Sequence, residues 1–109
     1  MKDFVSKLDN LNRRIDEAID VGNVEQLLSF LQTRGELLKM MDVENLDDET
    51  LRFLHNMVEE DKQRIARIEA LAKNYTDQAK RLANGKRAML QGYLNLQEAD
   101  RVRKIDRSV

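Results

Sequence analysis

An apolar seven-residue repeat runs from Leu51 to Leu96 and limits the possible folds of this chain more than any other feature. Its two core positions are apolar or aromatic at every step except two, where Asp61 and Lys86 stand. A repeat of this length is typical of a helix that packs along other helices. The sequence therefore predicts an all-α protein whose second half offers a long surface to another helix.

Composition supports one soluble helical domain. The chain has 109 residues with no proline, four glycines and 36% charged residues, as expected for an all-helical protein of this size. Cysteine is absent, which excludes disulfides, thiolate metal sites and a thiol nucleophile. The segment from Met1 to Lys7 lacks the apolar core of a signal peptide, and no stretch is apolar enough for membrane insertion. We therefore expect a cytoplasmic protein.

Two helices are predicted in the first forty residues. Phe4 to Ile19 shows apolar residues three and four apart, and Gly22 suits the end of that helix. Asn23, followed three residues later by Gln26, resembles the capping box of a second helix that reaches Met41. The two helices are expected to form an antiparallel hairpin. Gly35 in the second helix indicates either close approach of a neighbour or simple tolerance.

The rest of the chain predicts a long third helix and a short fourth one. Asp47 or Asp48 can cap the third helix, whose pattern runs unbroken to Ala83. Asn84-Gly85 can end it, with a fourth helix over residues 86–97, or the helix can continue through Gly85. The expected fold is an antiparallel helical bundle of three main helices with a long third helix and a short C-terminal fourth helix. It spans residues 1–97 and is followed by a charged tail, 98–109, with a mobile end.

Helix lengths then predict an exposed apolar stripe. The first two helices are about 18 residues each, near 27 Å, whereas the third is about 36 residues and near 54 Å. The hairpin cannot cover that length, so part of the third helix is left for a partner. The fourth helix, a second copy or a partner helix could cover it. The residues of this stripe are Ile68, Ala72, Tyr75, Ala79 and Leu82.

A second group of candidate partner-binding residues lies near the C-terminal end: Met89, Leu90, Tyr93 and Leu96. Met and Tyr suit adaptable interfaces, although these residues could equally close the protein's own core. As interface residues, Leu90 and Tyr93 should alter partner binding when replaced by alanine, with little change in thermal stability.

The polar residues indicate no catalytic or metal site. His55 is the only histidine, it is expected at or near the surface, and Glu59 at i+4 gives too weak a pattern for zinc. No phosphate-binding glycine loop or nucleophile pattern is present. The sequence thus predicts neither an enzyme nor a cofactor. Asp61 is either solvated at the edge of the bundle or paired with one of three arginines, where it would fix helix register; these are Arg13, Arg14 and Arg34.

Charge gives no general reason to expect nucleic acid as a partner. The net charge is -1, and the small basic excess after residue 80 lacks interleaved aromatic residues. A solvated basic end is therefore expected. A nucleic-acid-associated regulator is the weakest of the functional alternatives.

Several segments resemble FliT-type flagellar export chaperones. Residues 22–38 are similar to that family's second helix, with a Gly-polar pair, leucines and then Arg34-Gly35-Glu36-Leu37-Leu38. Asp61 with Ile65 and Ile68, the turn Gly85-Lys86-Arg87-Ala88, and Tyr93 resemble the second half. The ending Lys104-Ile105-Asp106-Arg107 is also similar. The likeness covers about four-fifths of the chain.

The resemblance implies a small helical bundle that acts in type III protein export. It would bind the filament-cap protein FliD, keep it unassembled and deliver it to the export gate FlhA and the export ATPase complex. A mobile C-terminal cover would correspond to Lys86 to about Gln97, and Tyr93 to the tyrosine that contributes to gate docking. FlgN-type and FliS-type chaperones are neighbouring possibilities with other cargoes. A structural coiled-coil homodimer or adaptor without a secreted client is the alternative from another class.

Overall fold

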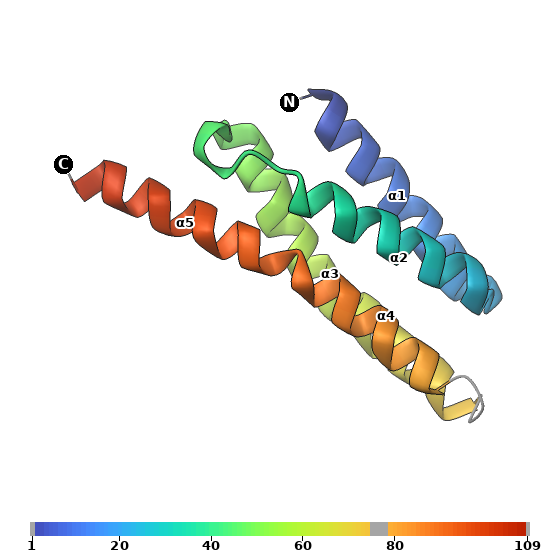
Figure 1. Cartoon of the computed structure of the whole chain (residues 1–109). Coiled ribbons are helices and arrows are strands. Elements are labelled where there is room, and N and C mark those ends of the chain that lie inside the picture. The colour runs from blue at the N-terminus through green and yellow to red at the C-terminus, as the bar shows by residue number, and fades with distance from the viewer. Residues whose placement is uncertain (1, 75–78, 109) are drawn as a thin grey trace.

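Four helices run alternately up and down, and a fifth extends past one end of them (Figure 1). The computed structural model describes the backbone of residues 2–74 and 79–108, and the side chains of residues 3–73 and 81–102. The elements in this part of the chain are α1 (Lys2–Val21), α2 (Val24–Lys39), the short 3-10 helix η1 (Val43–Asn45), α3 (Asp48–Asn74), α4 (Ala79–Gln91) and α5 (Tyr93–Ser108). The predicted all-α class is confirmed.

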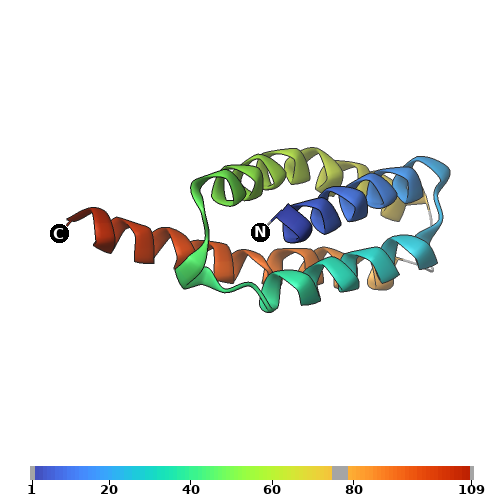
Figure 2. The same ribbon diagram turned by 90° about the horizontal axis from the view of Figure 1, so that it is seen from above.

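The helices α1 to α4 form two layers. Figure 2 shows α1 beside α3 in one layer and α2 beside α4 in the other. Within these two layers α1 packs against α2 and α3, and α4 packs against α2 and α3. This arrangement turns one apolar stripe of every helix toward a shared interior.

The predicted ends of the first helices are confirmed. Gly22 has φ +70°, and the N–H of Asn23 donates to Ala18 O at 2.9 Å, which closes α1. The side chain of Asn23 accepts from the N–H of Gln26 at 3.2 Å and caps α2. Asp47 Oδ1 accepts from the N–H of Thr50 at 2.7 Å at the start of α3.

The predicted length of the third helix is wrong. Helix α3 ends at Asn74, and α4 begins at Ala79 and runs back antiparallel beside α3 (Figures 1 and 2). Gly85 lies inside α4, so Asn84-Gly85 ends no helix. The apolar repeat specifies which face of a helix is buried. The same repeat fits one continuous helix and two helices that fold back against each other. Folding back buries that stripe within one chain.

The C-terminal boundary also differs from the expectation. The predicted limit between residues 97 and 98 falls within α5, which continues to Ser108. Ala99 is fully buried and packs in an apolar cluster with Met41 and Leu46. The first turns of α5 therefore belong to the bundle, while its later turns extend beyond it (Figure 1).

Helices α2 and α4 approach each other closely at glycines. A Cβ atom at Gly35 would lie 3.3 Å from the backbone oxygen of Ala88, and one at Gly92 would lie 2.5 Å from Leu38 Cδ1. At Gly85 the nearest atom would be Leu28 Cδ2, at 2.6 Å. The close-neighbour interpretation of Gly35 is thus confirmed, and α4 is the neighbour.

Candidate functional site

The interior of the bundle consists of two apolar clusters separated by a layer of polar side chains. One cluster lies toward the turn between α1 and α2 and includes Leu27, Ile68 and Leu82. The other lies toward η1 and includes Leu54 and Leu96. The side chains between them, which we call the polar layer, are Asn12, Arg34, Asp61, Arg64 and Tyr93.

Arg34 and Asp61 form the centre of the polar layer, and both are 0% exposed. Arg34 Nη2 donates to Asp61 Oδ2 at 2.6 Å, and Arg34 Nη1 donates to Asp61 Oδ1 at 3.1 Å. Arg34 Nη1 also donates to Asn12 Oδ1 at 2.7 Å. The two-point pairing joins α2 and α3, and the bond to Asn12 adds α1. Of the two alternatives for Asp61, pairing with an arginine is therefore the one found, and solvation at the bundle edge is excluded.

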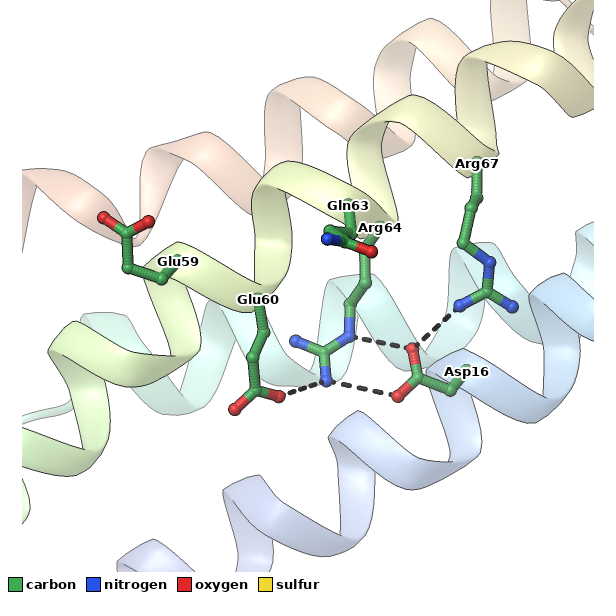
Figure 3. A pocket seen from close by; sticks show the side chains of 6 residues that line it. All are labelled: Asp16, Glu59, Glu60, Gln63, Arg64 and Arg67. Atoms are coloured by element: carbon green, nitrogen blue, oxygen red, sulfur yellow. Dashed lines mark hydrogen bonds and ion pairs between the residues drawn. The ribbon is translucent and has the colours of Figure 1, made fainter.

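Arg64 connects the polar layer to the surface. Its Nη1 donates to Asp61 Oδ1 at 2.9 Å, and its Nε donates to Asp16 Oδ1 at 2.9 Å. Its Nη2 also bonds to Asp16 and Glu60 (Figure 3). Arg64, Asp16 and Glu60 line a shallow groove of about 370 Å³ together with three further residues of α3, Glu59, Gln63 and Arg67. Asp16 and Glu60 already pair with arginines of this chain, and Glu59 pairs with Lys62, so every carboxylate that lines the groove is in an ion pair.

Tyr93 brings the C-terminal segment to the polar layer. It is the first residue of α5, directly after the turn at Gly92, and its hydroxyl donates to Asp61 Oδ2 at 2.5 Å. Two residues later, Asn95 Nδ2 donates to the backbone oxygen of Leu38 at 2.8 Å. The junction between α4 and α5 is thus held to α2 and α3 by polar groups.

Burial and hydrogen bonding change the acidity of these groups. Burial alone would raise the pKa of Asp61, but the hydrogen bond and charge of Arg34, with hydrogen bonds from Tyr93 and Arg64, outweigh it and lower that pKa. Burial and the hydrogen bond to the Asp61 carboxylate raise the pKa of Tyr93. Asp61 is therefore an anion and Tyr93 a neutral donor at neutral pH.

Acid should weaken the folded state through Asp61. Because its pKa is lower in the folded state than in the unfolded chain, its contribution is complete above the ordinary aspartate pKa of about 3.9. The contribution decreases as the pH falls from there through the lower folded-state pKa. We expect urea unfolding to show a steeper loss of stability below about pH 4 in the native chain than in Asp61→Asn. Equal pH profiles would contradict this assignment.

One polar atom of the layer has no hydrogen-bond partner. Arg34 Nε is buried and meets no acceptor among the described residues. Unpaired buried donors destabilise a folded protein and are uncommon in native structures. The polar layer is therefore built at some cost to stability.

Most of the predicted partner-binding residues lie inside the bundle. Ile68, Leu82, Met89 and Leu96 are buried, and Ala72 and Tyr93 are half-buried. Leu90 is 40% exposed. Tyr75 lies outside the described residues, and the side chain of Ala79 is likewise outside them. The described residues of the stripe predicted to be exposed, Ile68, Ala72 and Leu82, are thus largely covered, because α4 folds back against α3.

Sequence reasoning missed two members of the polar layer. Asn12 stands between Leu8 and Ile15 at core spacing, and Arg64 stands between Asp61 and Ile68. The sequence does show a polar residue at core spacing in each of several helices. That these residues meet can be inferred only once the helices are known to align at that level.

His55 is exposed, as predicted, and its partner comes from α5. Its Nε2 lies 3.0 Å from Asp100 Oδ1. Within the described residues, no group of three or more histidine or acidic side chains could hold a metal ion. No helix in the same part of the chain is both long and apolar enough to cross a membrane.

Comparison with known proteins gives no relative: neither a family model, nor a curated protein, nor a solved structure matches this chain.

Proposed function

We propose that this chain is a cytoplasmic export chaperone of the flagellar type III system, which binds the filament-cap protein FliD through helix-helix contacts. It would deliver FliD to the export gate FlhA and the export ATPase complex, without catalysis, cofactor or nucleic acid. The resemblance of residues 22–38, 61–93 and 104–107 to FliT-type chaperones motivates this identity. The observation that carries it is the way α4 and the first part of α5 lie over the apolar faces of α2 and α3.

We call residues 79–102, which include α4 and the start of α5, the cover segment. They replace the cover that the resemblance implied for Lys86 to about Gln97, because that range is split between two helices. Among the described residues, α4 contributes two buried apolar side chains, Leu82 and Met89, and α5 contributes two, Leu96 and Ala99, whereas α1 and α2 contribute four each. A helix held by few apolar contacts is a natural one to open.

The ion pairs of the cover segment also favour its release. Lys86 Nζ lies 2.6 Å from Glu69 Oε1, and Arg81 Nη2 lies 4.0 Å from Glu25 Oε1. All four side chains are substantially exposed, and ion pairs in such positions contribute little to stability. A cargo helix could therefore take the place of the cover segment at modest cost, using Ile68 and Ala72 on α3 as contacts.

Fixing the cover segment in place tests this proposal. The chain has no cysteine, so Glu69→Cys with Lys86→Cys provides two unique thiols that a bismaleimide can bridge between α3 and α4. We expect calorimetric titration with a FliD C-terminal peptide to show at least about tenfold weaker binding after bridging, because the stripe stays covered.

A bridge between α1 and α3 is the matched control. Arg67 and Asp20 form an exposed ion pair across those helices, so Asp20→Cys with Arg67→Cys ties the bundle without touching the cover segment. This bridged chain should bind the peptide like the unbridged one. Equal binding by the α3–α4 bridged chain would reject displacement of the cover, and no heat with any variant would reject FliD as the cargo.

The structural homodimer has less support than the chaperone. It would use the repeat from Leu51 to Leu96, but Leu54, Ile68 and Leu82 of that repeat are buried within one chain. The large apolar side chains that are most exposed among the described residues lie elsewhere, at Met40 with 82%, Val21 with 75% and Leu94 with 67%. Sedimentation across a dilution series should accordingly give the monomer mass.

A further inference from the structure

The polar layer sets a chemical requirement on any helix that replaces the cover segment. We infer that the partner of this bundle is an amphipathic helix with a neutral hydrogen-bond donor, a hydroxyl or an amide, at the level of Tyr93. This inference rests on the proposed function, because it assumes that a partner helix occupies the site of the cover segment. The inference specifies which partner helices can occupy that site.

The donors around Asp61 explain the requirement. Oδ1 accepts from Arg34 and Arg64, whereas Oδ2 accepts from Arg34 and from Tyr93. Tyr93 is the donor of this set that leaves when the cover segment leaves. An apolar side chain in its place would keep water out and leave Oδ2 short of a donor, which is costly for a buried carboxylate.

The charges in the polar layer explain why the donor should be neutral. Arg34 and Arg64 face the single carboxylate of Asp61, while Asp16 and Glu60 balance Arg64 from the surface side. A lysine at the level of Tyr93 would add a third buried cation to Arg34 and Arg64. An acidic side chain would stand directly against Asp61. A hydroxyl or an amide donates without either penalty.

The neighbours of Tyr93 define the rest of the recognition pattern. Buried apolar residues lie at eleven and four residues before it, Leu82 and Met89, and at three and six residues after it, Leu96 and Ala99. Small residues stand eight residues and one residue before it, at Gly85 and Gly92, where a Cβ atom would meet leucines of α2. A partner helix should therefore be apolar at four positions, small at two, and a neutral donor at one.

The test compares two labelled peptides on the unaltered full-length chain. One peptide has the sequence of residues 79–102, and the other has the same sequence with Tyr93→Phe. The chain's own cover segment competes equally with both, so the ratio of their affinities reports the donor alone. Fluorescence polarisation should show the tyrosine peptide binding at least about tenfold more tightly, since the lost hydrogen bond is to a charged group.

Two controls connect that ratio to Asp61. A peptide with Leu94→Ala, a change at a position that is 67% exposed, should bind like the native peptide. In a chain with Asp61→Leu and Arg34→Met, the tyrosine peptide should lose its advantage over the phenylalanine peptide, because the acceptor is gone.

The outcomes separate the inference from the proposed function. Equal binding of the tyrosine and phenylalanine peptides to the native chain would overturn the donor requirement and leave exchange of the cover segment intact. Failure of both peptides to bind would overturn both ideas, because no helix could then enter the site.

Discussion

Asp61→Ala is expected to lower the free energy of unfolding by about 3–5 kcal/mol, the range for breaking a buried ion pair. The substitution leaves Arg34 fully buried with a single remaining acceptor, Asn12 Oδ1. It also removes the acceptor of Tyr93 and one of the acceptors of Arg64. Urea unfolding at pH 7, followed by circular dichroism, measures the change.

Two further variants separate the charge of Asp61 from its size. Asp61→Asn keeps the shape and one acceptor, so its loss should be smaller than that of Asp61→Ala. Arg34→Met combined with Asp61→Leu removes both central charges and should recover much of the stability, because apolar replacement of a whole buried pair is often neutral or stabilising. A loss below about 1 kcal/mol for Asp61→Ala would indicate that water reaches the polar layer.

Met89→Ala is expected to cost about 2–5 kcal/mol, whereas Leu90→Ala should cost less than about 1 kcal/mol. The two residues are neighbours on α4, but Met89 is 1% exposed and packs in the cluster with Leu31 and Ile68, while Leu90 is 40% exposed. Truncation of Met89 leaves a cavity in the interior. Truncation of Leu90 mainly removes surface that water already reaches.

Thermal and urea unfolding of the two variants provide the comparison, with the native chain as reference. The two variants share the helix, the neighbouring sequence and the replacing residue, and Met and Leu have similar helix propensity, so helix propensity contributes similarly to both. Equal losses would mean that Leu90 is buried in solution, for example by a second copy, and a sedimentation experiment on the same samples would reveal that.

The structure predicts different effects on stability for two substitutions that the sequence treats alike. Leu90→Ala and Tyr93→Ala were both expected to leave the thermal stability nearly unchanged. That expectation remains for Leu90, but Tyr93 donates to a buried carboxylate, so its loss should destabilise the protein. The repeat places both residues near the C-terminal end of one stripe, and it contains no information about which acceptor lies opposite.

The sequence by itself determined the elements that depend on local chemistry. Gly22 and Asn23 specify the end of α1 and the start of α2, because a left-handed residue and a side-chain cap act within a few residues. Asp47 does the same for α3. The apolar repeat likewise specified which face of each helix is buried.

The tertiary structure alone decided where the long repeat folds back and what its polar exceptions do. An apolar stripe can be buried equally well by a partner helix or by its own chain. Only packing against α2 and α3 distinguishes the two. The close approach at Gly35 and Gly85 favours burial by the chain itself. Asp61 interrupts the repeat in the sequence. It becomes the centre of a site only when Arg34 from α2 and Tyr93 from α5 reach the same level of the bundle.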